Sequence, residues 1–193
     1  LLGPGDPVFY FLPGLLTPTT HVFKAYSAIL TNCYDTATVN VYRVELAPDA
    51  TNVCWKMTNQ VAIMVTNSYA PGGITWSGTN GLAVVSADNA GLLFTPTNST
   101  PTNYAVTAAA TGFTNCYDTA TVNVLRIDIE QTVTNVCAKM LLGQLNLTNS
   151  YAGGTNVMWE SDVDGLLGPG DPIFYFLPGL LTPTTHVFKA YSA

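Results

Sequence analysis

The sequence has little charge, and basic residues are the scarcest part of it. Asp, Glu, Lys and Arg make up 9% of the 193 residues, and 6 Lys and Arg stand against 12 Asp and Glu, which gives a formal charge of −6. Nucleic-acid binding requires a basic surface that neutralises phosphates. Disordered chains are normally rich in charge and poor in apolar residues. Because 48% of this chain is apolar, we expect a folded protein without a nucleic-acid partner.

Long apolar runs and helical periodicity are missing as well. The apolar runs 8–12 and 61–65 are far shorter than the roughly 20 residues of a membrane-spanning helix. Pro and Gly interrupt every candidate helix, so we expect almost no helix. The first residues contain neither an initiator Met nor a basic segment followed by an apolar one. No signal peptide is therefore visible, and we expect the chain to begin inside a longer protein or after processing.

Thr and Asn take the place of charged residues. The chain has 27 Thr and 15 Asn. Thr is β-branched and favours strands, whereas Asn is frequent in turns. A weakly charged, Thr-rich surface is typical of extracellular β-structure, so we predict an extracellular or cell-surface location.

The sequence is repetitive. Residues 1–28 recur at 166–193 with a single change, and the eleven residues 31–41 recur unchanged at 114–124, an offset of 114 − 31 = 83. The segment T-N-V-C at 51–54 also recurs 83 residues later. These offsets indicate tandem units of about 83 residues in which alternate units are nearly identical.

Both ends of the chain fall inside a unit, which divides it into residues 1–43, 44–126 and 127–193. We predict that only the middle range is a complete domain, between a C-terminal part and an N-terminal part of its neighbours. In one interpretation the chain is a window on a longer array. In the other, residues 29–43 of one chain complete the unfinished last unit of a neighbouring chain, as in donor-strand assembly.

Short alternating segments separated by Gly, Pro, Asn and Ser fill the middle unit, and they predict a β-sandwich. They lie at 60–65, 73–77, 82–86, 92–95, 104–110 and 119–126. After the last segment the apolar residues change parity, from Val122 and Val124 to Ile127 and Ile129. The same change occurs around residue 42. A strand that changes its buried face passes from one core to the next, so we predict that the units join without a linker.

The order of these signals resembles the Ig-like and PKD-like repeats of bacterial surface proteins. The resemblance rests on Val53-Cys54, Gly72-Gly73-Ile74-Thr75-Trp76, Gly81-Leu82, Thr95-Pro96, the segment 102–108 and the segment 116–124. It extends over nearly the whole chain and implies an all-β protein of tandem Ig-like sandwiches in a linear array. It also implies a Trp in the core, a Cys pair and a role in long secreted or surface-attached proteins.

The four cysteines are predicted to form disulfides. Cys54 and Cys116 lie 62 residues apart in one unit, a separation that joins early and late strands of a sandwich, so we predict that they pair. Such a bridge is worth about 4 kcal/mol in the chain-entropy model. Cys33 and Cys137 are expected to pair with partners in adjacent repeats or chains. Zinc is the alternative, but the sequence has no C-x2-C spacing.

No residue pattern points to catalysis, a cofactor or a metal. His21 and His186 occupy the position of Tyr104 in the middle unit, so we interpret them as structural. Asp162 and Asp164 alternate as in a calcium loop, yet the remaining EF-hand ligands are missing and a solvated turn is favoured. Motifs of zinc proteases, serine hydrolases, P-loop proteins and dinucleotide-binding folds do not occur. We therefore expect a protein that is not an enzyme.

The tryptophans and two asparagines complete the set of candidate residues. Trp76 and Trp159 are predicted to pack on the disulfide in their cores, whereas Trp55 lacks a counterpart and is the candidate for an exposed contact. Asn98 and Asn146 stand in glycosylation sequons.

Repetition argues against an active site, which requires a unique set of residues. We expect a structural component of an extracellular filament or cell-surface stalk, with itself as partner. The alternative is an adhesin whose repeats bind glycans or another surface, and a third possibility is a spacer for an enzyme elsewhere in the protein.

Overall fold

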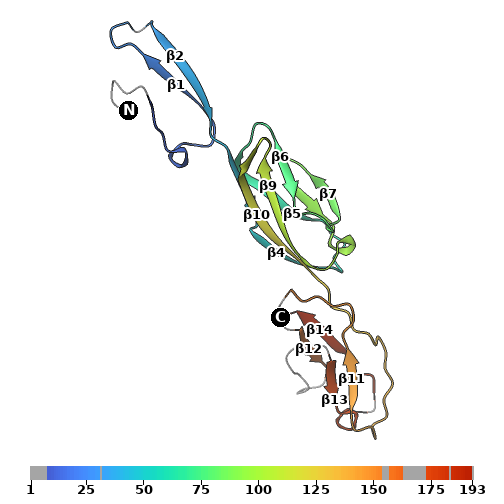
Figure 1. Ribbon diagram of the computed structural model, residues 1–193. Helices are drawn as coiled ribbons and strands as arrows, with labels where there is room; N and C mark the ends of the chain where they lie inside the picture. The colour runs from blue at the N-terminus through green and yellow to red at the C-terminus, as the bar shows by residue number, and fades with distance from the viewer. Residues whose placement is uncertain (1–7, 31, 154–156, 163–172, 183, 193) are drawn as a thin grey trace.

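The chain is an all-β protein with an elongated shape. The computed structural model describes residues 8–30, 32–153, 157–162, 173–182 and 184–192. Three groups of strands follow one another along its length (Figure 1): a hairpin (residues 20–40), a complete sandwich (43–125) and a smaller third part (126–192). Apart from the strands, the described residues contain only 3-10 turns, η1 (Pro13–Leu15), η2 (Pro96–Asn98) and η3 (Pro178–Leu180).

The middle unit is a sandwich of two four-stranded sheets. One sheet has the order β3 (Arg43–Ala47), β5 (Val61–Tyr69), β8 (Gly91–Phe94), β7 (Val84–Ala87). The other has the order β4 (Ala50–Cys54), β10 (Phe113–Leu125), β9 (Asn103–Ala110), β6 (Ile74–Ser77). β4 runs parallel to β10, whereas the other pairs are antiparallel. This order, with the first strand split between both sheets, is that of an immunoglobulin-like sandwich.

The core of the middle unit comes from alternate residues of both sheets. Ile63, Phe94, Val106, Val122 and Val124 have no exposed surface. Along β10 the residues between these valines face outward, which is the period of two that a strand with one buried face requires. The predicted segments therefore match the strands of this unit to within a few residues, but β4 was not expected.

The third part repeats half of this sandwich, strand for strand. β11 (Gly143–Asn146) pairs with β13 (Ile173–Phe176), and β12 (Val157–Ser161) pairs with β14 (Phe188–Ser192). Trp159 lies opposite Ala190 as Trp76 lies opposite Ala108, so the register is the same. Bridges from Arg126 to Tyr151 and from Ile129 to Leu147 stand where β3 pairs with β5. Leu145, Trp159, Phe174 and Phe176 form its core.

The hairpin of β1 (Thr20–Tyr26) and β2 (Tyr34–Asn40) corresponds to β9 and β10 of the middle unit. Thr20 to Tyr26 pair with Asn40 to Tyr34 in an unbroken antiparallel register. Phe9 and Phe11 lie against Phe23, with ring centroids 5.2 and 5.6 Å away. The equivalent rings of the third part, Phe174 and Phe176, lie 5.6 and 5.2 Å from Phe188. Equal sequences thus pack in equal ways at both ends of the chain.

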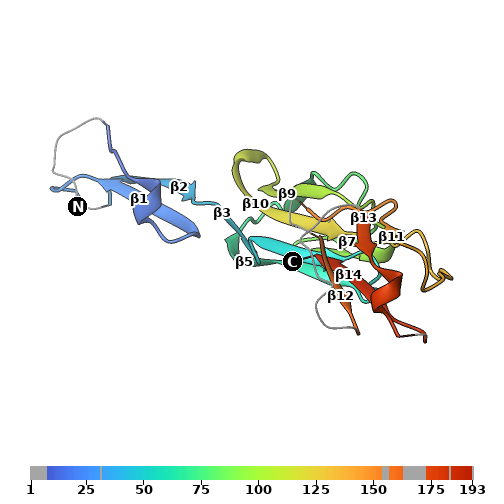
Figure 2. The same cartoon turned by 90° about the horizontal axis from the view of Figure 1, so that it is seen from below.

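The predicted change of buried face is present where the parts join. β2 ends at Asn40 and β3 begins at Arg43, so two residues separate them. Val44 and Leu46 then enter the middle core. After β10, Ile129 packs on the core of the third part. Figure 2, which is turned by 90° from the view of Figure 1, shows the hairpin projecting from the end of the sandwich.

Candidate functional site

After each joint, the following part begins with the same kind of side-chain contacts: an Arg, a carboxylate two residues later and a Ser of the neighbouring strand. At the first joint Arg43 donates from Nε to Oε1 of Glu45 at 2.7 Å, and the amide of Glu45 donates to Oγ of Ser68 at 2.9 Å. At the second joint the Arg126 Nε and Asp128 Oδ2 atoms are 2.6 Å apart, and the Asp128 amide donates to Oγ of Ser150 at 2.9 Å. The connections are therefore specified in sequence.

A left-handed asparagine shapes each joint. Asn67 has a φ of 44° and Asn149 a φ of 47°, a region that Asn tolerates better than most residues. Each stands in the segment T-N-S-Y, at 66–69 and at 148–151, and the kink turns the following serine toward the first strand of the unit. The sequence signal for this kink is thus the repeated tetrapeptide T-N-S-Y, which is not among the repeats from which the units were predicted.

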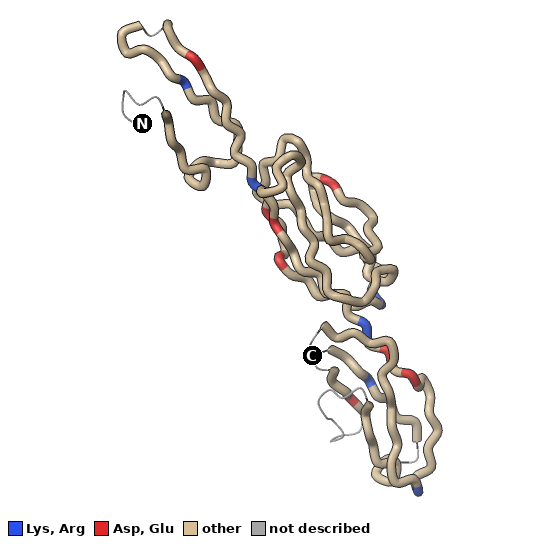
Figure 3. Tube along the Cα trace, in the orientation of Figure 1, with Lys and Arg blue, Asp and Glu red and all other residues tan. Residues whose placement is uncertain are grey.

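Contacts across the joints hold neighbouring parts together. At the first joint the hydroxyls of Thr20 and Tyr69 are 2.6 Å apart, and the rings of Tyr42 and Phe113 stack at 4.2 Å. At the second joint the Lys56 ammonium lies 3.4 Å from Asp128. Figure 3 shows how thinly charged residues are scattered over the rest of the chain, so the charges at the joints are a large share of the total.

Asp128 is the electrostatic centre of the second joint. Burial alone would raise the pKa of its carboxyl, but the hydrogen bond and charge of Arg126, together with Lys56, outweigh burial and lower the pKa below its ordinary value. The Arg126 guanidinium also lies over the ring of Trp55, 4.2 Å from its centroid. The joint therefore favours an ionised carboxylate.

Trp55 does not provide the exposed contact that the sequence suggested. Its indole N–H donates to the carbonyl of Ser99 at 3.0 Å, its ring packs against the middle core, and Arg126 covers it. A half-buried ring that is already stacked cannot offer a flat face to a sugar. Trp55, which has no counterpart in the third part, is thus a contact of the second joint.

The predicted disulfide between Cys54 and Cys116 is wrong. Cys54 lies opposite Leu125 at the end of β10, because β4 runs parallel to that strand. Cys116 lies near the other end of β10, next to a bulge and the backbone of Val44. Nine residues of strand at about 3.3 Å each separate the two positions by about 30 Å, whereas a disulfide requires Cα atoms within about 7 Å.

Within this chain none of the four cysteines is paired, and the expected pairing of Cys33 and Cys137 with partners in adjacent repeats or chains stays a prediction. Cys33, Cys54 and Cys137 are exposed and Cys116 is half-buried. Burial raises the pKa of the Cys116 thiol, and a hydrogen bond with the Val44 backbone opposes this only in part. Trp76 and Trp159 were expected to pack on a disulfide in their cores. Instead, Trp159 stacks on Phe174, and the indole N–H of Trp76 donates to the carbonyl of Asp88 at 2.9 Å.

The histidines occupy the corner that tyrosine occupies in the middle unit. The hydroxyl of Tyr104 donates to the carbonyl of Thr100, four residues upstream, at 2.6 Å. Nε2 of His21 lies 2.8 Å from the carbonyl of Thr17, and Nε2 of His186 lies 2.9 Å from that of Thr182. A tyrosine corner of this kind fixes the entry of strand F in immunoglobulin-like sandwiches, and histidine makes the same contact here.

The remaining candidates are occupied by local contacts or exposed in turns. Oδ1 of Asp162 accepts from the amide of Val187 at 3.2 Å and lies 3.3 Å from Nδ1 of His186; Asp164 lies outside the described residues. Asn146 is half-buried in β11 and donates to Glu130 at 2.9 Å, which disfavours a glycan there. Asn98 is exposed at the end of η2.

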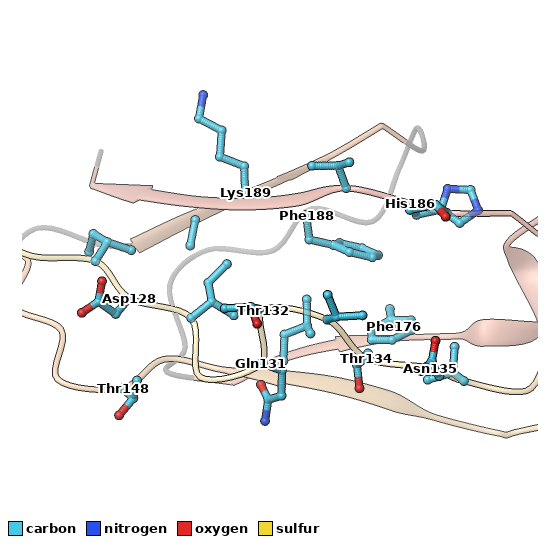
Figure 4. Close-up of a pocket in the computed structure, with 18 of the residues that line it drawn as sticks. Asp128, Gln131, Thr132, Thr134, Asn135, Thr148, Phe176, His186, Phe188 and Lys189 are labelled. Carbon is cyan, nitrogen blue, oxygen red and sulfur yellow. The ribbon is translucent and has the colours of Figure 1, made fainter. Parts of the chain in front are cut away.

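One side of the third part has an open groove next to the second joint. Its cavity of about 1060 Å³ lies between residues 131–136 and residues 184–190, with Leu145 and Phe176 as its apolar floor. Thr132, Thr134 and Asn135 face Phe188 and His186 across it (Figure 4).

Comparisons with known proteins assign no family. No family model and no curated protein matches the chain. Among solved structures, extracellular cadherin domains 1–4 of protocadherin gamma B7 are similar at 14% identity with a TM-score of 0.32. The match covers 77% of this chain and 45% of that chain, so this chain spans less than half of its length. In the described ranges no helix is long and apolar enough to cross a membrane.

Proposed function

We propose that the chain is a structural component of an extracellular filament or cell-surface stalk built from tandem Ig-like units in a linear array. The observation that carries the proposal is the repeated register: the middle unit and the third part pair the same positions in the same way, from the Trp–Ala pair to the bridges of the first strand. Copies of one module arranged along a line form an extended structure, which suits a mechanical role better than a role that depends on a single binding pocket.

The joints support a stiff arrangement. Two residues separate β2 from β3, and the first strand of the unit after each joint carries an Arg–carboxylate pair and a serine contact. Flexible linkers are longer and rich in Gly and Ser. The contacts that cross the joints, between Thr20 and Tyr69 at the first and between Lys56 and Asp128 at the second, favour a fixed orientation of each unit relative to the one before.

The low charge and the Thr-rich surface support an extracellular setting and contact between copies. In the second half of β10 the outward residues Thr119, Thr121 and Asn123 are polar and uncharged, as is Thr107 opposite Thr119. The likeness of the sequence motifs to bacterial surface repeats agrees with this setting. An adhesin that binds glycans has less support, because Trp55 is covered at the joint.

Electron microscopy of native material tests the proposal. The expected result is unbranched filaments whose thickness is that of one or a few sandwiches, with a regular axial repeat. Isolated compact particles under all conditions, or saturable binding of glycans by a protein that never assembles, would contradict it.

A further inference from the structure

We propose that the outer face of the sheet β4-β10-β9-β6 packs against the same face of a second copy of this chain. We call this surface the polar face; it consists of the outward-pointing residues of these four strands. The inference rests on the proposed function, because it names a lateral contact between neighbouring arrays. It concerns the middle unit, all of whose strands the structure describes.

A ladder of three asparagines crosses the polar face. Asn103, Asn123 and Asn52 lie side by side on β9, β10 and β4. The side-chain amide of Asn103 donates to Oδ1 of Asn123 at 2.5 Å, and that of Asn123 donates to Oδ1 of Asn52 at 2.7 Å. These side chains are thus ordered before a partner binds, which lowers the entropic cost of docking. Each amide has two N–H groups and two acceptor lone pairs, so the ladder keeps groups that a partner can use.

The rows next to the ladder contain only short, uncharged side chains. Thr107 lies opposite Thr119, and their hydroxyl oxygens are 3.0 Å apart. Thr121 lies between Ala105 and Ala50. No outward position of these four strands carries Lys, Arg, Asp or Glu. The polar face is therefore flat and uncharged.

A flat, uncharged face of this kind is complementary to itself. A face of one charge repels its own copy and requires a partner of the opposite charge. Each Thr and Asn of the polar face instead carries both donors and acceptors, so the same face of a second copy can satisfy them. The chain as a whole has a formal charge of −6, so copies repel each other least where they present this face. These features favour a second copy as the occupant.

Charges at the two ends of β4 favour one orientation of the pair. Asp49 stands directly before β4 and Lys56 two residues after it, and both are exposed. A two-fold axis across the strands at the ladder places β4 of one copy antiparallel on β4 of the other, with Asn52 on Asn52. Asp49 of each copy then lies at the Lys56 end of its partner. Opposite charges thus meet at both ends of an isologous contact.

The size of the polar face predicts a weak contact for a single pair of units. Four strands about 4.8 Å apart and about six residues long span about 19 by 20 Å, so two copies bury about 800 Å² together. Stable pairs bury at least about 1,200 Å². Strong association therefore requires several units along an array, whose contacts act together.

Elements of the ladder recur in the flanking parts. Thr20 and Asn40 occupy the positions of Asn103 and Asn123, and the Thr20 hydroxyl donates to Oδ1 of Asn40 at 2.6 Å. Asn135 occupies the position of Asn52 in the segment T-N-V-C. The ladder is thus a property of the repeat, as a lateral contact between arrays requires.

Exchange of charge in the ladder tests the polar face in the full chain. Asn123→Asp keeps the size of the side chain and the acceptor for Asn103, but it places two carboxylates face to face in the pair. In sedimentation with reductant at up to about 1 mM, the parent is expected to associate weakly. The Asn123→Asp and Asn123→Lys chains are each expected to associate at least about tenfold more weakly, whereas their mixture regains association.

A matched control places the same charge on the other sheet. Met64 is 47% exposed on the outer face of the sheet that contains β5, and the Met64→Asp chain is expected to associate within about threefold of the parent. In NMR spectra of the parent, the side-chain amide signals of the three ladder asparagines are expected to shift with concentration. The signal of Asn67, at the end of β5 in the other sheet, is expected to stay in place.

The outcomes distinguish the two proposals. A parent chain that stays monomeric at about 1 mM, ladder signals that do not shift, or a mixture that does not regain association would overturn the inference. Loss of association in Met64→Asp but not in Asn123→Asp would do the same, because it assigns the contact to the other sheet. Filaments that keep their lateral packing in the Asn123→Asp chain would overturn the polar face and leave the filament proposal intact. Association regained by the mixture, without filaments in microscopy, would support the polar face and contradict the filament proposal.

Discussion

At the scale of single residues, the strand-F corner is a single contact made by two different side chains. A phenol in the middle unit and imidazoles in the flanking parts reach the carbonyl four residues upstream at 2.6 to 2.9 Å. Both are rings with a polar tip that can lie along the sheet and hydrogen-bond to the backbone. The substitution therefore preserves the corner and does not signal a catalytic or metal-binding histidine.

Tyr104→Phe is expected to destabilise the middle unit by about 1–3 kcal/mol, because the Thr100 carbonyl loses its donor in a partly buried setting. Burial raises the pKa of Tyr104, and the hydrogen bonds to Thr100 oppose this only in part. The raised pKa agrees with a phenol that stays protonated and donates. Urea denaturation measures the loss. Tyr117→Phe is the control, since that side chain is 59% exposed, and an equal loss in both variants would contradict the role of the corner.

The free cysteines give a chemical prediction. In the folded, unreduced chain, Cys33, Cys54 and Cys137 are expected to alkylate rapidly and Cys116 slowly, because Cys116 is half-buried and its raised pKa lowers the fraction of thiolate at neutral pH. Differential alkylation with mass spectrometry measures the four rates. Equal rates in urea serve as the control. If Cys54 and Cys116 instead react only after the chain has been reduced, the two residues are joined by the disulfide that the sequence predicted.

At the scale of elements, the sequence predicted what depends on local pattern. Alternation predicted β5, β6, β7, β8, β9 and β10, and the change of parity predicted where one core gives way to the next. β4 was not predicted, because the segment T-N-V-C carries no strand pattern of its own. Its second copy at 134–137 forms no strand, so β4 exists because β10 lies beside it.

The prediction of a disulfide between Cys54 and Cys116 was wrong for a related reason. A separation of 62 residues is compatible with neighbouring strands, but it does not say at which height along the strands the two residues lie. The parallel register of β4 on β10 decides this and places Cys54 opposite Leu125. Register of this kind depends on tertiary pairing, which the spacing of two cysteines does not contain. The domain boundaries at 43/44 and 126/127 stay predictions.

The second joint is expected to weaken when Asp128 loses its charge. Asp128→Asn removes the ion pairs with Arg126 and Lys56, and partly exposed pairs of this kind contribute up to about 1 kcal/mol. Hydrogen exchange at the amides of Arg126 and Tyr151, which bond each other's carbonyls, is expected to accelerate up to about fivefold. The exposed Asp49→Asn is the control, and unchanged exchange in the Asp128 variant would contradict the role of the charge.

The same joint gives a pH dependence of definite sign. The pKa of Asp128 is lowered in the folded chain, so the unfolded chain binds more protons as pH falls. The stabilisation is therefore fully present above the ordinary aspartate pKa of about 3.9 and is lost as pH falls through the lower folded value. Exchange at Arg126 is expected to accelerate over that acid range in the parent chain and not in Asp128→Asn. Parallel profiles in both chains would contradict the assignment.

At the scale of the whole molecule, equal sequence gives equal structure. The middle unit and the third part pair the same positions, from the Trp–Ala pair to the bridges of the first strand. The aromatic cluster of Phe9, Phe11 and Phe23 likewise recurs as Phe174, Phe176 and Phe188. The repeated register could therefore be predicted from the repeat of the sequence. The contacts between neighbouring parts, such as the Lys56–Asp128 ion pair, could not, because only the tertiary arrangement brings these residues together.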